Sequence, residues 1–409
     1  MLNIKQIKRT FVSLKTRNYR LYFIGQGISL CGTWMQTIGQ AWLVLKITGS
    51  GTALGMVAAF QFVPMLVLGS FGGVIADRFS KRNILYFTQT AAGGLALMLG
   101  ILVATDLVKL WMIYIFVFSL GLVNAIDNPT RQTFIMEMVG KDQLPNAVSL
   151  NSTEVNLARV IGPAIGGGLI ATLGLAPLFI INGISYVGVL VALFRMRAEE
   201  LHPAVIAEHT KGQLREGFRY VKSTPLLLNS LLMMAIIGML SYEFNVSLPL
   251  FARFTFQSDA AGYAGLTTAM GIGSVIGGLY TATRRKVTVW MLINAAWLFG
   301  LVILLTAIAP TLWLAMLGMV LVGIFSINFL SLGNVTLQLG STAQMRGRVM
   351  GLWAVAFLGT TPIGGPIIGW IGQHAGPRWG LAVGGFAALA AGAVGARVLR
   401  KQQYQEIAT

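Results

Sequence analysis

Apolar residues in this chain occur in long runs separated by short polar connectors. Runs of 18 or more predominantly apolar residues recur from Tyr19 nearly to the C-terminus. Each is long enough to cross a hydrocarbon core of roughly 30 Å as a helix. The pattern therefore predicts about twelve transmembrane helices in two sets of six. The first set is expected at 19–46, 52–76, 83–105, 109–128, 144–172 and 176–195. The second is expected at 226–251, 261–283, 288–309, 311–336, 347–372 and 377–398.

The one substantial polar stretch, 198–225, separates the two sets. Within it Leu214, Phe218 and Val221 share one helical face, which predicts an amphipathic helix lying at the membrane interface. We expect an all-α membrane protein with an N-terminal six-helix bundle at 1–197, a cytoplasmic linker with an interfacial helix at 198–225, and a C-terminal six-helix bundle at 226–409.

A short motif repeats between the two halves. Gly162-Pro163-Ala164-Ile165-Gly166 in the fifth span recurs 203 residues later as Gly365-Pro366-Ile367-Ile368-Gly369 in the eleventh. Six spans per half preserve orientation, so the two bundles should be related by a pseudo-two-fold axis along the membrane normal, an arrangement typical of rocker-type transporters.

Composition and charge agree with this architecture. Hydrophobic residues make up 55% of the 409 residues and charged residues only 11%, whereas a soluble protein carries about 25% charged residues. The net charge of +17 could indicate nucleic-acid binding, but the basic residues lie between the spans. With the N-terminus inside, the cytoplasmic segments hold 25 Lys and Arg and the outer segments four. This asymmetry predicts a multi-pass protein of the cytoplasmic (inner) membrane with both termini in the cytoplasm.

Charged residues within the spans are candidates for function, because a charge at membrane depth is costly. The candidates for proton coupling are Asp127, Glu154, Arg159 and Glu243. A carboxyl group that faces a cavity can gain and lose a proton as access alternates. The alternatives are a structural pair of Asp127 or Glu154 with Arg131, Arg159 or a helix end, and a near-interface position for Glu243.

Polar residues form a stripe along the first span. Gln26, Ser29, Thr33, Gln36, Thr37 and Gln40 share one helical face. Lipid would penalise such a stripe, so it should face the bundle interior. The candidates for a substrate cavity are Gln26, Thr33, Trp34, Thr37, Gln40, Tyr242, Asn245 and Asn328. The alternative is that these side chains hold helices together by hydrogen bonds.

The loop after the second span reads Gly73-Val74-Ile75-Ala76-Asp77-Arg78-Phe79-Ser80-Lys81-Arg82. Gly73 would allow two helices to pack closely. Asp77 would face the partially positive N-terminus of the eleventh span. Together with Arg78, Lys81 and Arg82 it would form a gating latch between the halves. The alternative is that the three basic residues only enforce topology.

This loop resembles the Gly-x-Leu-Ala-Asp-Arg-x-Gly-Arg-Lys motif of the major facilitator superfamily, with Ile75 in place of Leu and Ser80 in place of the second Gly. Ala158 to Gly167 resembles the exporter motif Gly-x-x-x-Gly-Pro-x-x-Gly-Gly, with Ala158 replacing the first Gly. Its Gly162, Pro163 and Gly166, like Gly365, Pro366 and Gly369, would serve helix packing. Asp127-Asn128-Pro129-Thr130-Arg131-Gln132 and Arg346-Gly347-Arg348-Val349-Met350 resemble a narrower exporter group that includes the enterobactin exporters.

The resemblance implies a secondary active transporter, a proton-coupled antiporter that exports a siderophore or drug-like molecule by alternating access. The alternatives are a lipid flippase on the same fold and a membrane receptor or structural protein. The chain has no phosphate-binding loop of the Gly-x-x-x-x-Gly-Lys-Ser/Thr type and no metal-ligand spacing among His202, His209 and His374. We therefore expect no enzyme activity, cofactor, metal or nucleic acid. The expected partners are a small-molecule substrate, protons and the lipid bilayer, with the chain acting as a monomer.

Overall fold

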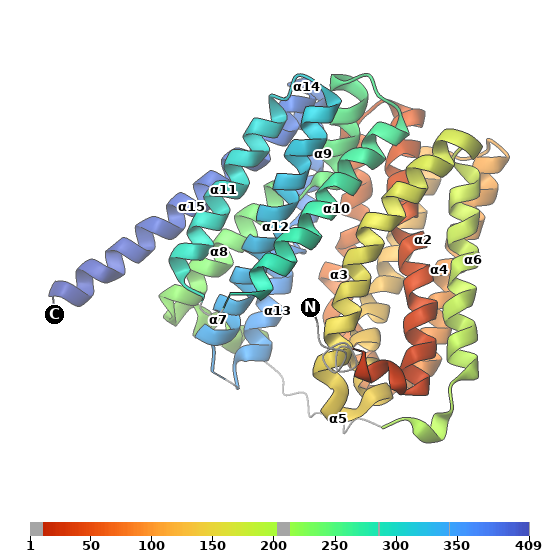
Figure 1. The fold of residues 1–409 in the computed structure, drawn as a ribbon, viewed down its shortest axis with the longest axis horizontal. Helices are drawn as coiled ribbons and strands as arrows, with labels where there is room; N and C mark the ends of the chain where they lie inside the picture. The colour runs from red at the N-terminus through yellow and green to blue at the C-terminus, as the bar shows by residue number, and fades with distance from the viewer. Residues whose placement is uncertain (1–10, 203–212, 285–286, 343, 409) are drawn as a thin grey trace, which may run out of the picture. The chain divides into compact units, whose positions relative to one another are not determined.

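The computed structural model describes residues 11–202, 213–284, 287–342 and 344–408, and these residues form helices and contain no strand (Figure 1). The elements of the first half are η1 (Val12–Lys15), α2 (Arg17–Thr48), α3 (Gly51–Arg78), α4 (Lys81–Ala104), α5 (Leu110–Leu173), α6 (Ala176–Arg195) and η2 (Ala198–Glu200). The remaining elements are α7 (Gln213–Ser223), α8 (Pro225–Leu240), α9 (Phe244–Leu250), the π-helical turn η3 (Phe251–Thr255), α10 (Ala260–Ala282), α11 (Val289–Ala307), α12 (Leu312–Gly340), α13 (Arg346–Phe357), α14 (Thr361–His374) and α15 (Pro377–Ala408).

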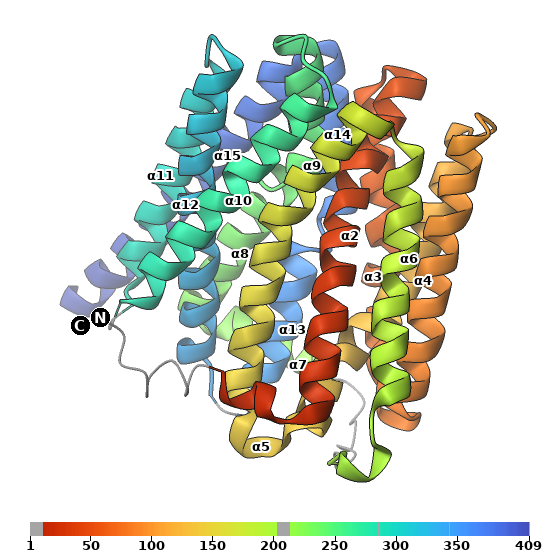
Figure 2. The ribbon, with the colours of Figure 1, turned by 45° about the vertical axis from the view of Figure 1, so that its right-hand side comes forward.

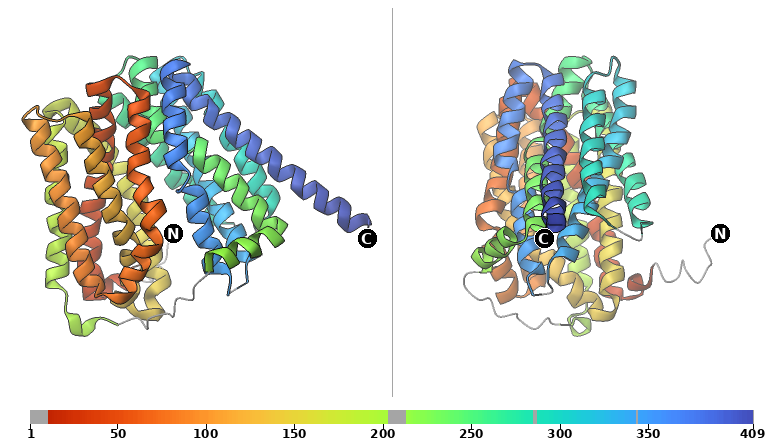
Figure 3. Two further views of the ribbon diagram at one scale, coloured as in Figure 1. Left: turned by 180° about the vertical axis from the view of Figure 1, so that it is seen from behind. Right: turned by 90° about the vertical axis from the view of Figure 1, so that its left-hand side faces the viewer.

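The helices gather into two compact units. The first unit holds Met1–Leu43 and Val63–Glu208, and the second holds Val44–Phe62 and His209–Thr409. The end of α2 and the first part of α3 thus belong with the second unit, although they precede most of the first unit in sequence. In the second unit the C-terminal end of α15 extends beyond the other helices (Figure 3).

The predicted all-α membrane fold is confirmed. Nine helices in the described part of the chain are long and apolar enough to cross a membrane. One of them, α5, covers both the fourth and the fifth predicted spans, with a break in helical backbone at Gly140, where φ is 70°. Glycine adopts this left-handed conformation without steric cost, and the two limbs of α5 run in opposite directions (Figure 2). The helix α2, whose polar stripe lowers its hydropathy, is not among the nine.

Two spans that the sequence predicts as continuous are broken in the second unit. The seventh span divides into α8 and α9 at 241–243, and the eleventh divides into α13 and α14 at 358–360. The two helix pairs contact each other near these breaks, because a Cβ placed on Gly238 would lie 2.5 Å from the backbone oxygen of Phe357. Broken helices free backbone polar groups at membrane depth, which proteins tolerate only where the backbone is buried or lines a cavity.

The amphipathic helix predicted in the linker forms as α7. Val221 is buried and Phe218 is exposed on this helix. Glu216 forms a 2.6 Å ion pair with Arg348 at the start of α13, and the hydroxyl of Tyr220 accepts a hydrogen bond from the backbone nitrogen of Thr342. The linker helix is therefore fastened to the second unit at the beginning of the eleventh span.

Both Gly-Pro motifs lie at close helix contacts. A Cβ on Gly162 of α5 would lie 2.5 Å from Cβ of Trp34 and 2.8 Å from the carbonyl oxygen of Cys31 on α2. A Cβ on Gly365 of α14 would lie 3.0 Å from the carbonyl oxygen of Gly55 on α3, within the second unit. Both motifs thus let a helix backbone approach its neighbour, as expected for small residues at membrane helix interfaces.

Substitution at the first of these contacts should lower stability. We expect Gly162→Ala to cost about 1–3 kcal/mol, because the added methyl group would overlap α2, and to lower the thermal unfolding midpoint of the purified protein. The matched control is Gly168→Ala on the same limb of α5, where a Cβ would meet no atom within 4 Å. An equal loss of stability in both variants would contradict the contact.

Candidate functional site

Asp127 lies at the centre of a hydrogen-bonded cluster in the first unit. Its side chain is buried, and its Oδ1 accepts hydrogen bonds from Thr88 Oγ1 at 2.7 Å and Gln89 Nε2 at 2.8 Å. Its Oδ2 accepts from a guanidinium nitrogen of Arg131 at 2.5 Å. The helices α4 and α5 thus supply both oxygens of Asp127 with partners, and the structural pair that the sequence left as an alternative for Asp127 is present.

Glu154, on the second limb of α5, is in a different environment. Its side chain is buried, and its Oε1 has no hydrogen-bond partner within the described residues. The carboxyl group lies directly against Gly27 of α2, where a Cβ would come within 2.7 Å of Oε1. Arg131 interacts with Glu154 electrostatically while its hydrogen bonds go to Asp127 and Asn128. Glu154 is therefore a buried carboxyl group. The absence of a side chain at Gly27 leaves space for it, and Arg131 interacts with it electrostatically.

The polar stripe of α2 is used partly for helix packing. Gln36 Oε1 accepts a hydrogen bond from Asn182 Nδ2 of α6 at 2.6 Å. Thr33 Oγ1 donates to the backbone oxygen of Ser29 and lies 3.5 Å from the hydroxyl of Tyr186. The bond between Asn182 and Gln36 joins α6 to α2, as the alternative drawn from the sequence expects, whereas the Thr33–Ser29 bond lies within α2.

Not every polar atom of the stripe has a hydrogen-bond partner within the described residues. Gln26 and Gln40 are buried, and Gln26 Oε1 has no hydrogen-bond partner within the described residues. Thr37 donates to the backbone oxygen of Thr33. Next to the stripe, the guanidinium carbon of Arg159 lies 5.0 Å from the ring centroid of Trp34, an arrangement that stabilises a cation within a membrane protein.

The second unit holds a comparable buried carboxyl group at the break between α8 and α9. Glu243 precedes the first residue of α9, its side chain is buried, and its Oε1 has no hydrogen-bond partner within the described residues. Thr361, the first residue of α14, hydrogen-bonds to the carboxyl group. Cβ atoms on Gly364 and Gly365 would lie 3.2 and 3.6 Å from its two oxygens. The Gly-Gly-Pro segment of α14 therefore makes room for Glu243, as Gly27 does for Glu154.

An aromatic cluster forms around Tyr242, the residue that precedes Glu243. The ring of Tyr242 lies 4.8 Å from that of Phe357, 5.6 Å from that of Phe299 and 5.8 Å from that of Phe244, measured between centroids. Trp353 stacks on Phe357 at 5.9 Å. The predicted cavity residue Tyr242 is thus part of an aromatic cluster beside Glu243, whereas Asn245 is exposed.

The latch residues that the structure describes have partners inside the first unit. Lys81 forms a 2.6 Å ion pair with Glu137 of α5. Arg82 donates to the backbone oxygens of Leu193 and Phe194 at the end of α6. Lys81 and Arg82 therefore join α4 to α5 and α6.

Other parts of the latch prediction are not supported or lie outside the description. Arg78 is exposed at the end of α3. The side chain of Asp77 lies outside the described residues. A Cβ on Gly73 would meet no atom within 4 Å, whereas the Cβ of neighbouring Gly72 would overlap the backbone of Ala125. The close contact predicted for Gly73 therefore belongs to Gly72.

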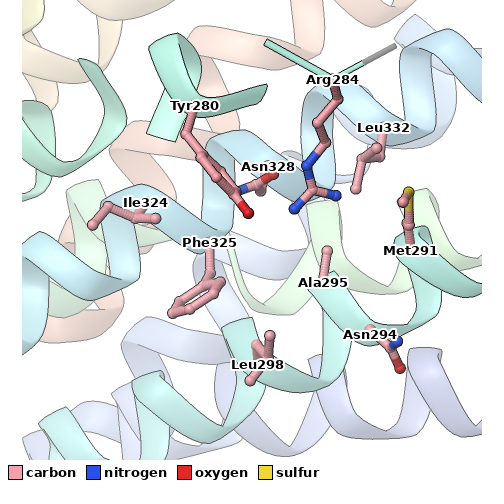
Figure 4. A pocket seen from close by; sticks show the side chains of 10 residues that line it. All are labelled: Tyr280, Arg284, Met291, Asn294, Ala295, Leu298, Ile324, Phe325, Asn328 and Leu332. Carbon is pink, nitrogen blue, oxygen red and sulfur yellow. The ribbon is translucent and has the colours of Figure 1, made fainter. Parts of the chain in front are cut away.

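Asn328 belongs to the second unit. It is buried on α12, its Oδ1 accepts a hydrogen bond from Thr281 at 2.8 Å, and it lines a cavity of about 860 Å³ among α10, α11 and α12 (Figure 4). Among the described residues no group of three His, Cys, Asp or Glu side chains is placed to hold a metal ion.

Several residues of these clusters were not predicted from the sequence. Thr88 and Gln89 stand as an adjacent polar pair in an apolar span. This signal was available. Glu137 and Thr361 had no such signal, because each lies beside a helix end where a polar residue is ordinary.

The different environments of Asp127 and Glu154 predict effects of different size on stability when each is replaced by its amide. Asp127→Asn leaves Arg131 without its counter-ion and should lower the free energy of unfolding by roughly 3 kcal/mol. This is the lower end of the range for a buried ion pair, because the Arg131 side chain is 20% exposed. Glu154→Gln should leave stability within about 1 kcal/mol of wild type, because an amide of the same shape supplies a donor. Thermal unfolding of both purified variants measures this, and a larger loss for Glu154→Gln would contradict the assignment.

Comparisons with known proteins agree with the fold and the motifs. The family model described as "Transmembrane secretion effector" matches residues 8–408. The chain is 27% identical over 386 residues to the enterobactin exporter of Shigella flexneri, covering 91% of this chain and 90% of that protein. It is 24% identical over 339 residues to the staphyloferrin A transporter of Staphylococcus aureus, covering 81% and 84%. It is also 24% identical over 368 residues to the multidrug efflux pump Tap of Mycolicibacterium fortuitum, covering 84% and 87%.

A solved structure shares the fold at low sequence identity. A bacterial homologue of the human lysosomal transporter Spinster superposes with a TM-score of 0.73 at 14% identity and covers 96% of this chain and 97% of its own. The family match spans nearly the whole chain, and the predicted resemblance is confirmed. The chain belongs to the transmembrane secretion effector family of the major facilitator superfamily, whose members are multi-pass membrane transporters.

Proposed function

We propose that the chain is a proton-coupled exporter of a medium-sized amphipathic molecule, such as a siderophore or a drug-like compound, and works by alternating access. It would act in the cytoplasmic membrane with both termini in the cytoplasm. The observation that carries the proposal is that each unit buries one glutamate, Glu154 or Glu243, whose Oε1 has no hydrogen-bond partner within the described residues.

A buried carboxyl group without full hydrogen bonding is suited to carry a proton. Its negative charge is costly in a medium of low dielectric constant, and one proton removes that charge. When the site opens to water, solvation lowers the free energy of the charged carboxylate, and the proton can leave. Asp127 is less suited, because Arg131, Thr88 and Gln89 already stabilise its charge.

The surroundings of the two glutamates support an amphipathic substrate. The aromatic cluster around Tyr242 offers apolar and polarisable surface beside Glu243, and the stripe of α2 offers the unused amide oxygen of Gln26. Sites that combine aromatic walls with a few polar groups suit molecules of drug-like size. Export rather than uptake is supported by the relatives named as an enterobactin exporter and a multidrug efflux pump.

Transport by reconstituted vesicles under an imposed pH gradient tests this proposal. Candidate catecholate and carboxylate siderophores and cationic dyes are the substrates. We expect Glu154→Gln and Glu243→Gln to reduce gradient-driven export to the level of protein-free vesicles, because neither amide can exchange a proton. Downhill exchange of substrate should persist in both variants.

The control variant is Glu199→Gln, which changes an exposed carboxyl group outside the spans and should export like wild type. Proton coupling would be contradicted if collapsing the gradient left wild-type export unchanged, or if both buried-glutamate variants exported normally.

We also propose that Asp77 acts as a latch with the N-terminus of α13, the first part of the eleventh span. A carboxylate near a helix N-terminus gains about 0.5–1 kcal/mol from the helix dipole. Lys81 and Arg82 would anchor the segment beside it, since both are bonded to neighbouring helices of the first unit.

Loss of the Asp77 charge should slow transport without unfolding the protein. We expect Asp77→Asn to lower export roughly two- to fivefold, the effect of losing such a charge–dipole contact, with an unchanged unfolding midpoint. Asp106→Asn, in an exposed connector, is the matched control. Wild-type export by a well-expressed Asp77→Asn protein would leave the basic residues of this loop as topology signals and packing residues.

A further inference from the structure

The second unit carries a groove that the proposed transport function does not use. The helices α10 and α11 both pack along α12, and the space between them is a cavity of about 860 Å³. We call it the α10–α11 groove and define it by Tyr280, Arg284, Asn294, Leu298, Phe325 and Asn328, which are among its lining residues (Figure 4).

One end of the groove is polar and positively charged. Arg284 is the one charged residue among the described residues that line it, and it forms no ion pair within the described part of the chain. Its guanidinium carbon lies 4.9 Å from the ring centroid of Tyr280. Figure 4 shows the guanidinium group and the Tyr280 hydroxyl facing the same space. A cation held there without a counter-charge favours an anionic ligand.

Amide groups add hydrogen-bonding capacity at this end. The hydroxyl of Thr281 lies 2.8 Å from Oδ1 of Asn328, and this contact orients the side-chain amide of Asn328 in the groove. With Arg284 and Tyr280, Asn328 gives this end of the groove the polar side chains that bind phosphate oxygens.

The other end of the groove is apolar and open. Its wall includes Phe325 of α12 and Leu298 of α11, and Leu298 is 43% exposed. The exposed apolar side chains continue along α11 through Leu301 and Leu305. In a membrane such a row faces the hydrocarbon core. The groove therefore changes from cationic to apolar along the direction in which a lipid changes from headgroup to acyl chain.

The position along the helices agrees with this polarity. Arg284 follows the last residue of α10, and Leu298 lies about two turns into α11. The Lys and Arg distribution predicts that this end of α10 is cytoplasmic, and the cytoplasmic leaflet carries anionic phospholipid. An anionic ligand with an attached acyl chain is available at that depth.

We propose that the α10–α11 groove binds one anionic phospholipid, with Arg284 and Tyr280 on its headgroup phosphate and its acyl chain along Phe325 and Leu298. The site is independent of the glutamates of the proposed coupling mechanism. The packing of α10, α11 and α12 in the second unit would then depend on the lipid composition of the membrane, because these helices meet at the bound lipid.

Native mass spectrometry of the full-length protein, purified and stripped of lipid, tests this site. The probes are phosphatidylglycerol and phosphatidylcholine with matched acyl chains. We expect one phosphatidylglycerol to bind in preference to phosphatidylcholine. Arg284→Ala should weaken phosphatidylglycerol binding roughly tenfold, as expected for loss of a charge-assisted hydrogen bond, and Arg284→Lys should recover part of it. Leu298→Ala should also weaken it, because it shortens the apolar wall.

The matched control is Arg195→Ala, which removes an exposed charge near the end of α6, outside the groove, and should bind phosphatidylglycerol like wild type. Equal binding by wild type and the Arg284→Ala protein would overturn the proposal. It would also fail if glycerol 1-phosphate at the same concentration displaced the lipid, because the site would then bind a free phosphate group rather than a phospholipid.

Discussion

The rest of this molecule depends on how it places negative charge in a medium that does not solvate it. Transferring a carboxylate from water to an apolar environment is prohibitive unless hydrogen bonds, a counter-charge or a proton compensate. Asp127 receives two hydrogen bonds and an ion pair with Arg131. Glu154 and Glu243 each keep one oxygen without a partner within the described residues. The same constraint thus separates a structural acid from two acids suited to exchange protons.

Glycine makes these buried acids possible. Each of the two glutamates lies against glycine on a neighbouring helix, Gly27 in the first unit and Gly364 with Gly365 in the second. A Cβ at Gly27 would overlap the carboxyl group of Glu154 and one at Gly364 would crowd that of Glu243, whereas one at Gly365 would only touch it. The same Gly-Pro segments also bring helix backbones together, so packing and the placement of charge depend on the same residues. The basic side chains of Lys81 and Arg82 also contribute to packing, since both join helices of the first unit.

Much of this architecture could be predicted from the sequence, because apolar run length and Lys and Arg asymmetry are set by the bilayer. The spans, the amphipathic linker helix and the packing role of Gly162 all follow from such local rules. The breaks at Glu243 and before Thr361 were not predicted, because each apolar run is long enough to be taken as one span, although Ser241-Tyr242-Glu243 and Gly359-Thr360-Thr361-Pro362 interrupt these runs. Nor could the sequence decide between a paired Asp127 and an unpaired Glu154. That difference depends on Thr88 and Gln89 of another helix, which spacing along α5 does not reveal.

The protonation state of the two glutamates tests the central claim most directly. Infrared difference spectroscopy of the purified protein, recorded as the pH is changed, detects the carbonyl stretch of a protonated carboxyl group. The account predicts a protonated-carboxyl signal that decreases in Glu154→Gln and again in Glu243→Gln, and that persists in Asp127→Asn. A signal that is absent from the wild type near neutral pH, or one that only Asp127→Asn removes, would contradict it.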